Sequence, residues 1–273
     1  MTPVEKKLLG QMVKASIDFK LIEDNDRIMA CMSGGKDSYA MLHLLQLIQK
    51  RAPFSFEIVA VNLDQGHPNF PGHTLENYFS EIGVEYRMLS VDTYSIVLDK
   101  VPKGKAYCSL CSRLRRGILY NAAVDLNCNK LALGHHRDDI IETLLLNVFY
   151  SGQLKAMSPR LRSDDGRNIV IRPLSYCSES DIELLSKQQK FPIIPCNLCG
   201  SQENLKRKKV KKLISSLHAE NPNVRGNMFH ALQNVKPSHL LDSSLRKNIL
   251  EDPFIHEDPY ARLVSNTNEL DNL

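Results

Sequence analysis

Along the N-terminal half of the chain, short apolar runs alternate with stretches in which apolar residues recur every three or four positions. The short runs are typical of buried strands, and the wider spacing is typical of helices that cover them. Strands are predicted at residues 27–32, 56–64, 84–91 and 130–135. Helices are predicted around residues 41–48 and at residues 73–83, 112–127 and 138–152.

This βαβαβαβα order predicts an α/β fold. Parallel strands need crossover connections, and the resulting sheet is covered by helices on both faces. We therefore expect a Rossmann-like parallel sheet, whose ligands bind beyond the carboxyl ends of the strands.

An additional helix is predicted at the N-terminus. Thr2 is a candidate N-cap, Pro3 suits the first turn, and Glu5 has the spacing of a capping box. The apolar stripe expected to face the core consists of Leu8, Leu9, Met12, Val13 and Ile17.

Beyond Gly152 the alternation weakens. A hairpin turn at residues 162–168, a strand at 168–174, a capped helix at 178–189 and a basic helix after a cysteine loop are predicted. From about Ser243, sparse apolar residues indicate a loosely held tail. We expect four parts: an N-terminal helix (1–24), a nucleotide-binding domain (25–152), a C-terminal part (153–242) and an acidic tail (243–273).

The composition is that of an ordinary globular protein, with 42% hydrophobic and 24% charged residues. We find no secretory signal and no apolar run long enough to cross a bilayer, which predicts a cytoplasmic protein without a membrane partner. The net charge is +4, although residues 250–273 hold six acids and only one base, Arg262. Basic runs at residues 103–116 and 206–212 together favour a polyanionic partner over an anionic lipid surface, while either run alone fits a solvated helix face equally well.

The stretch "SGGKDS", residues 33–38, joins the first predicted strand to its helix. It lacks the first glycine of a standard P-loop, so a different anion cradle is indicated. Gly34 and Gly35 let the backbone approach a ligand, while the following helix directs N–H groups at an anion. Ser33 and Ser38 add hydroxyl groups and Lys36 adds a positive charge, which together suit a polyphosphate.

Two other polar clusters follow strand ends: "NLDQGH", which contains Asp64, and "GHHRDD", residues 134–139. If the sheet is parallel, these clusters and the glycine turn converge on one crevice. Adjacent side chains on a strand point in opposite directions, so at most one of His135 and His136 should enter it. Asp138 and Asp139 begin a helix, where an N-cap role competes with a catalytic one.

The cysteines include two C-x-x-C pairs, Cys108 with Cys111 and Cys196 with Cys199. In a reducing compartment, two such pairs indicate a metal centre. The spacing fits a structural zinc or an iron–sulfur cluster equally well. Three isolated cysteines are interpreted as core residues: Cys31, Cys128 and Cys177.

"SGGKDS" resembles the PP-loop of the ATP-pyrophosphatase superfamily. The ordered set "SGGKDS", "CSLCSRLRRG", "GHHRDDIIETLLLN" and "PIIPCNLCGSQ", followed by a basic segment, is similar to the tRNA 2-thiocytidine synthetase (TtcA) family. This resemblance extends from Val4 to about Asp242. It implies ATP-dependent thiolation of cytidine 32 in the tRNA anticodon loop.

The resemblance also implies a site. A [4Fe–4S] cluster would be held by Cys108, Cys111 and Cys199, while Cys196 matches the motif without being a ligand. ATP and Mg²⁺ would bind at Ser33, Gly34, Gly35, Lys36, Asp37, Ser38, Asp64 and Gly134, with Lys36, Asp138 and Asp139 as catalytic residues. A homodimer supplied with sulfur by a cysteine desulfurase is further implied.

Two classes of alternative remain open at this point. Another PP-loop tRNA modifier, a 2-thiouridine or lysidine synthetase, would use the same adenylation. A zinc-stabilised nucleic-acid-binding protein would use neither the ATP site nor an iron–sulfur cluster.

Overall fold

The computed structural model describes residues 1–66, 70–100, 108–194 and 202–245. Cys196, Cys199 and most of the acidic tail lie outside the described residues, and the side chain of Cys108 is likewise not described. By compactness the chain divides into a unit at residues 1–229 and a second one at residues 230–273. All of the site residues described below belong to the first unit.

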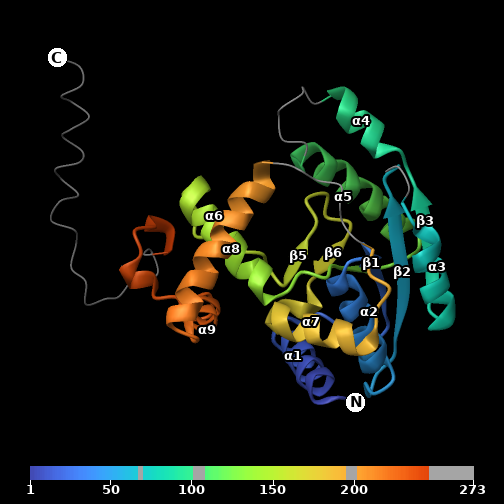
Figure 1. Cartoon of the computed structure of the whole chain (residues 1–273), viewed down its shortest axis with the longest axis horizontal. Coiled ribbons are helices and arrows are strands. Elements are labelled where there is room, and N and C mark those ends of the chain that lie inside the picture. The colour runs from blue at the N-terminus through green and yellow to red at the C-terminus, as the bar shows by residue number, and fades with distance from the viewer. Residues whose placement is uncertain (67–69, 101–107, 195–201, 246–273) are drawn as a thin grey trace. The chain divides into compact units, whose positions relative to one another are not determined.

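The central sheet has six strands in the order β3-β2-β1-β4-β6-β5 (Figure 1). Every neighbouring pair is parallel except β5 and β6, which form an antiparallel hairpin at one edge. This confirms the predicted α/β class and the hairpin turn. The strands are β1 (Asp26–Met32), β2 (Phe56–Asp64), β3 (Glu85–Ser90), β4 (Lys130–Ala132), β5 (Arg160–Arg162) and β6 (Ile169–Ile171).

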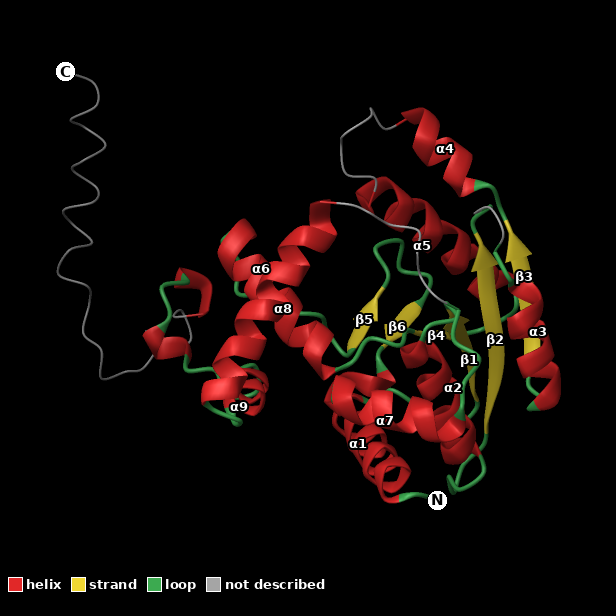
Figure 2. Cartoon of the chain, in the orientation of Figure 1, coloured by secondary structure: helices red, strands yellow, loops and turns green. Residues whose placement is uncertain are grey.

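Helices lie on both faces of this sheet (Figure 2). One apolar core packs β1 and β2 against helices α1, α2 and α7, and a smaller core packs the other face against α5. The helices are α1 (Pro3–Phe19), α2 (Lys36–Gln49), α3 (Gly72–Glu81), α4 (Thr93–Lys100), α5 (Cys108–Asp125), α6 (Arg137–Ser151), α7 (Glu179–Gln189), α8 (Gln202–Glu220) and α9 (Val224–Ala231).

Local sequence explains where the helices begin. Thr2 and Glu5 form both halves of a capping box on α1, as predicted. The core-facing stripe of α1 differs from the prediction: Val13 and Ile17 are 38% and 72% exposed. Leu8 and Met12 are buried as predicted, and Val4 and Ala15 complete the buried apolar stripe with a spacing of four, four and three residues.

Helix α5 begins at Cys108, four residues before its predicted start. The first C-x-x-C pair therefore lies on the first turn of a helix, where positions three residues apart share one face. Helices α4 and α9 were not predicted. Each has only eight residues, which is too short for an apolar period to stand out.

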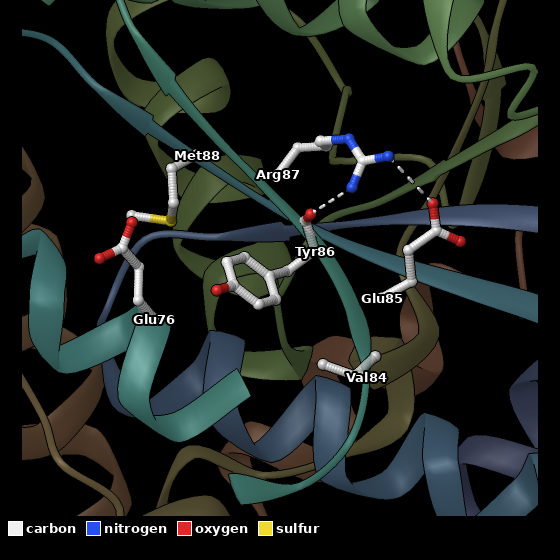
Figure 3. Close-up of a pocket in the computed structure, with 6 residues that line it drawn as sticks. All are labelled: Glu76, Val84, Glu85, Tyr86, Arg87 and Met88. Carbon is white, nitrogen blue, oxygen red and sulfur yellow. Dashed lines mark hydrogen bonds and ion pairs between the residues drawn. The ribbon is translucent and has the colours of Figure 1, made fainter. Parts of the chain in front are cut away.

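Strand β3 forms the other edge of the sheet, and a pocket of about 500 Å³ lies against it (Figure 3). Among its polar residues, Arg87 donates to the Tyr86 carbonyl, and Glu85 pairs with Arg87 and, at 2.9 Å, with Arg27 of β1. Charged side chains on an edge strand discourage pairing with another chain. None of the predicted site residues lines this pocket.

Candidate active site at the carboxyl end of the sheet

The PP-loop residues form a tight turn between β1 and α2. Gly34 has φ of +80°, and a Cβ built there would lie 2.9 Å from Cδ1 of Ile194. The Ile194 N–H donates to the Gly34 carbonyl at 2.9 Å. Glycine is therefore needed here both for its backbone conformation and for the close approach of the segment that leads to the second cysteine pair.

The N-terminus of α2 is arranged to receive an anion. Gly35 is the N-cap and supplies no side-chain capping bond. The Ser38 hydroxyl donates to the Gly35 carbonyl at 2.8 Å, and Ser33 Oγ accepts from the Gly35 N–H at 3.3 Å. The turn is thus held by its own serines, and the positive end of the helix dipole is directed at the crevice.

Lys36 lies between two carboxylates. Its Nζ is 3.2 Å from Asp37 Oδ1 and 3.3 Å from Glu179 Oε1. Burial disfavours the charged ammonium, but the charges of Asp37 and Glu179 outweigh it and raise the pKa of Lys36. Lys36 is consequently a fixed cation beside the helix N-terminus.

Asp37 is less well compensated. Lys36 Nζ donates to its Oδ2 at 3.4 Å, whereas the buried Oδ1 accepts no hydrogen bond within the described part of the chain. Burial raises the pKa of Asp37 despite the opposing charges of His136 and Lys36. An oxygen with an unused lone pair in such a position suits a hard cation.

The "GHHRDD" loop meets the PP-loop, as predicted. A Cβ at Gly134 would lie 3.1 Å from the backbone of Asp37 and Ser38, so a larger residue would require the PP-loop backbone to shift by a few tenths of an ångström. His136 caps α6 with Asp139 in a reciprocal capping box. Its Nε2 lies 3.8 Å from Asp37 Oδ1.

His135 is turned toward a different partner. Its Nδ1 accepts a hydrogen bond from Arg172 Nε at 3.2 Å. Burial and the charge of Arg172 lower the pKa of His135 to about 4. His135 is therefore neutral near pH 7, whereas His136 is the histidine that lies against Asp37.

Asp138 and Asp139 have different environments. Asp138 is 3% exposed, and its two oxygens accept from the Glu179 N–H at 2.9 Å and from Arg225 at 2.6 Å. Asp139 lies 3.4 Å from His136 Nε2 and 3.3 Å from Arg207. Asp138 thus ties helices α6, α7 and α9 together, while Asp139 lies on the side of the PP-loop.

Asp64, at the end of β2, is placed beside the site by strand pairing. Residues Met32 and Asn62 are partners in the register of β1 and β2, and the Asn62 amide donates to the Met32 carbonyl at 2.8 Å. The Asp64 carboxylate accepts from the Gly66 N–H at 2.9 Å. No contact between described residues joins Asp64 to the PP-loop directly.

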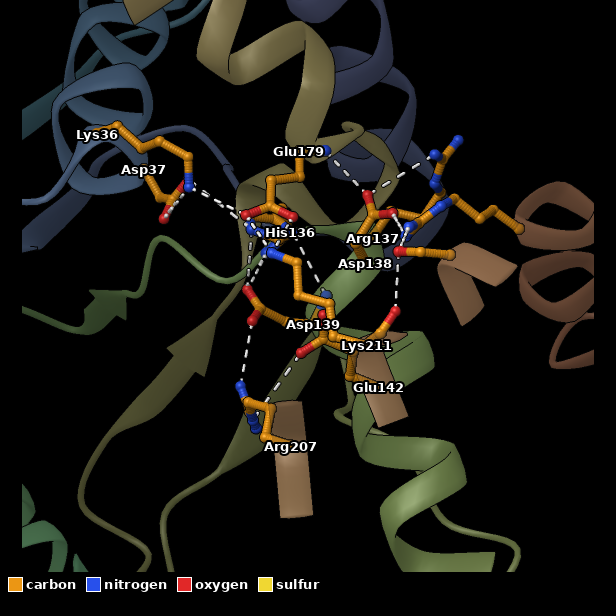
Figure 4. Close-up of polar contacts among 12 residues, drawn as sticks. Lys36, Asp37, His136, Arg137, Asp138, Asp139, Glu142, Glu179, Arg207 and Lys211 are labelled. Carbon is orange, nitrogen blue, oxygen red and sulfur yellow. Dashed lines mark hydrogen bonds and ion pairs between the residues drawn. The ribbon is translucent and has the colours of Figure 1, made fainter. Parts of the chain in front are cut away.

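Glu179 is a site residue that the sequence analysis missed (Figure 4). It accepts from Lys211 at 2.8 and 2.7 Å and also pairs with Lys36, so one carboxylate joins the PP-loop to the basic helix α8. The hydrogen bond with Lys211 and the charge of Lys36 outweigh burial and lower the pKa of Glu179. Glu179 is the first residue of a capped helix, a position in which an acid usually has only a helix-dipole role.

Helix α8 is partly turned inward. Arg207 contacts Asp139 and lies 3.9 Å from Glu142, and Val210 and Ile214 are buried against α6. Beside this network, Arg137, Asp138, Glu179 and Arg225 contribute to a pocket of about 590 Å³. Within the described residues, no ion pair involves Lys208, Lys209 or Lys212, which are exposed. Only part of the predicted basic surface is therefore available to an external polyanion.

Of the four paired cysteines, the structure describes the Cys111 side chain. Its Sγ donates to Gln65 Oε1 at 3.2 Å, just beyond the carboxyl end of β2. The isolated cysteines Cys31, Cys128 and Cys177 are buried, as interpreted. Burial raises the pKa of Cys31 and of Cys177 to about 12, so neither is a reactive thiolate.

In the part of the chain that the structure covers, three or more His, Cys, Asp or Glu side chains nowhere gather as a metal site would require. The described helices also include none with the length and apolarity of a membrane span.

Comparison with known proteins identifies the family. A family model described as a PP-loop domain matches residues 2–215. Over 248 residues, the chain is 57% identical to a protein of Anaeromyxobacter dehalogenans named tRNA-cytidine(32) 2-sulfurtransferase, covering 91% of this chain and 86% of the relative. A protein of Hahella chejuensis with the same name is 58% identical over 245 residues, covering 90% and 86%.

Among solved structures, the U34-tRNA thiolase NcsA from Methanococcus maripaludis, determined with its [4Fe–4S] cluster, has a TM-score of 0.67. The identity is 20%, and the match covers 86% of this chain and 80% of NcsA, so it supports the fold alone. The fold, the PP-loop geometry and the relatives agree: this chain belongs to the tRNA-cytidine(32) 2-sulfurtransferase (TtcA) family of PP-loop proteins.

Proposed function

We propose that this protein is an ATP-dependent tRNA sulfurtransferase that converts cytidine 32 of the anticodon loop to 2-thiocytidine. The observation that carries the proposal is the identity of 57% to a tRNA-cytidine(32) 2-sulfurtransferase across 91% of the chain. The PP-loop turn, with Lys36 at the open N-terminus of α2, supports the ATP-dependent part of the reaction.

The chemistry follows from the poor leaving ability of oxide. The cytosine O2 attacks the α-phosphorus of ATP, and the bond to pyrophosphate breaks. Sulfur then attacks C2, and the C2–O bond breaks with AMP as the leaving group. Lys36 and the N–H groups at the start of α2 stabilise the negative charge on pyrophosphate, while Ser33, Gly34, Gly35 and Ser38 shape the cradle.

Mg²⁺ is expected between the nucleotide phosphates and one or two protein carboxylates, which is its usual mode of binding. Asp37 fits this role because its buried Oδ1 accepts no hydrogen bond among the described residues. Asp139 is the better candidate for contact with the reacting groups, and Asp138 for positioning, because both Asp138 oxygens are already bonded. Asp64 and Gly134 border the nucleotide.

We further propose that Cys108, Cys111 and Cys199 hold a [4Fe–4S] cluster. Cys111 fits because it lies beside Gln65 at the carboxyl end of the sheet. Ile194, the last described residue before the second cysteine pair, donates to the Gly34 carbonyl of the PP-loop. When bound, a cluster with one iron free of cysteine supplies a place to hold sulfide for attack on C2.

The same proposal extends to the tRNA contacts, the sulfur donor and the oligomeric state. Exposed lysines of α8 bind tRNA phosphates, a cysteine desulfurase supplies sulfur, and the enzyme acts as a homodimer in the cytoplasm, where tRNA is modified. The division into parts at residues 1–24, 25–152, 153–242 and 243–273 is also retained as a proposal.

The test is nucleoside analysis of unmodified tRNA after anaerobic incubation with the reconstituted protein, ATP, Mg²⁺ and sulfide. We expect 2-thiocytidine in the complete reaction and none without ATP. Formation of 2-thiouridine or lysidine would show that the substrate is another tRNA nucleoside. Binding of one zinc ion without any release of pyrophosphate would show that the protein is not a thiolase. Replacing Cys108, Cys111 or Cys199 with alanine should abolish iron binding, whereas replacing Cys196 with alanine should not.

A further inference from the structure

The C-terminal end of helix α6 presents aromatic side chains to solvent. Phe149 and Tyr150 are 53% and 49% exposed, and Leu154, shortly after the helix, is 75% exposed. All residues from 148 to 155 are exposed. A large apolar side chain in water is ordinary when it is single, but neighbouring exposed aromatic rings mark a binding surface.

A basic residue of α8 lies over one of these rings. Helices α6 and α8 pack together (Figure 1), and Lys206 Nζ lies 4.7 Å from the centre of the Tyr150 ring. Lys209 is three residues further along α8, on the same flank of the helix, and is exposed. The surface therefore combines two aromatic faces with two cations, at the opposite flank from the inward-facing Arg207 and Lys211.

We propose that this aromatic platform, formed by Phe149, Tyr150, Lys206 and Lys209, stacks an unpaired base of the anticodon loop a few nucleotides from the target cytidine. Aromatic faces combined with cations are the usual binding surface for single-stranded nucleic acid. The cores of protein–protein interfaces are instead depleted of lysine, which argues against a second copy of this chain as the occupant.

The position of the platform fits that role. Asp139 lies in the first turn of α6 and Tyr150 in its last, so a straight helix separates them by about 16 Å. A loop of RNA can bridge this distance with a few nucleotides. A base held at Tyr150 would fix the loop while cytidine 32 enters the crevice. This inference rests on the proposed function for the identity of the RNA.

The experiment measures binding of an anticodon stem–loop RNA, carrying 2-aminopurine in its loop, to the full-length protein. Tyr150→Ala should weaken binding about tenfold and abolish the change in 2-aminopurine fluorescence that reports stacking. Tyr150→Phe should remain within a few-fold of the wild type because it keeps the ring. Ile17→Ala, which removes another exposed apolar side chain, is the matched control and should change nothing.

Wild-type affinity and fluorescence in Tyr150→Ala would overturn the inference. A Phe149→Ala, Tyr150→Ala double variant that binds RNA normally but becomes monomeric would also overturn it and assign the surface to a second copy. The outcome is separable from that of the proposed function, because RNA binding is measured without turnover. If the wild type forms 2-thiocytidine and Tyr150→Ala binds RNA normally, the platform is wrong and the proposed function stands. If Tyr150→Ala weakens RNA binding but the wild type forms no 2-thiocytidine, only the proposed reaction is wrong.

Discussion

The two ends of the sheet both bury a lysine among carboxylates, with different results. At the amino end, Lys130 is 2% exposed and lies 2.6 Å from Asp26 and 2.8 Å from Glu23. The other Asp26 oxygen accepts from the Asn129 amide at 2.7 Å. At the carboxyl end, Lys36 has two carboxylate partners, but Asp37 Oδ1, 3.2 Å from Lys36 Nζ, accepts no hydrogen bond among the described residues.

The difference indicates what each network is for. A buried charge whose hydrogen bonds are complete fixes neighbouring strands, and removing one partner leaves the other uncompensated. An incomplete network costs stability and is retained where a ligand completes it. The amino end therefore holds the fold together, and the carboxyl end fits the proposed nucleotide and Mg²⁺ site.

The same substitution at each lysine separates these roles most sharply. Lys36→Met should lower tRNA-dependent pyrophosphate release about 100- to 1000-fold, because a cation that stabilises developing charge is removed. Its unfolding midpoint should remain close to that of the wild type. Pyrophosphate release is measured by a coupled phosphate assay, and a loss below tenfold would contradict the role of Lys36.

Lys130→Met should have the opposite effect. It leaves Asp26 buried without its cation, which should lower the free energy of unfolding by about 3 kcal/mol. The turnover number of the folded protein should not change. Chemical denaturation monitored by circular dichroism measures the loss, and an unchanged denaturation midpoint would show that the amino-end network is dispensable.

Glu179→Gln tests the link between the PP-loop and α8. It removes the charge that Lys36 and Lys211 share, so kcat/KM for ATP should fall about tenfold, as for one charge-assisted hydrogen bond. Glu183→Gln changes an exposed acid of the same helix and serves as the control. Equal kinetics for the two variants would mean that Glu179 has only a helix-dipole role in α7.

Asp37→Asn should have a small effect on stability, and its sign is informative. The carboxyl pKa lies above its ordinary value of 3.8 in the folded protein because of burial. Raising the pH from 3.8 through the folded-state pKa of Asp37 therefore lowers the free energy of unfolding. The asparagine amide of the variant does not ionise, so the variant does not lose this stability. At pH 7 we expect Tm to rise by about 2 °C while pyrophosphate release falls. A lower Tm, in calorimetry, would contradict an uncompensated Asp37.

The sequence predicted the sheet, its order of elements and the meeting of "SGGKDS" with "GHHRDD", because these depend on apolar periodicity and on glycines that permit close approach. It did not predict Glu179, which is 143 residues from Lys36 along the chain. "SESD" reads as a capped helix start, and an acid there has an ordinary local explanation. Its only distinguishing signal was the basic helix that follows, whose Lys211 needs a carboxylate partner.

The basic helix shows the same limit. A run of six cations in seven residues predicts a polyanion site, yet Arg207 and Lys211 compensate carboxylates of the protein itself. Which members of a charged run face inward depends on the packing of Val210 and Ile214 against α6. That packing is a tertiary property, and the run alone does not reveal it.

The most direct test of activation at the carboxyl end follows one oxygen atom. Transcript tRNA labelled with ¹⁸O at the C2 oxygen of cytidine is incubated anaerobically with the reconstituted enzyme, ATP and sulfide, and the AMP is analysed by mass spectrometry. Adenylation of the cytosine oxygen predicts one ¹⁸O atom in AMP for each 2-thiocytidine formed. AMP that carries only oxygen from ATP and water would contradict the account.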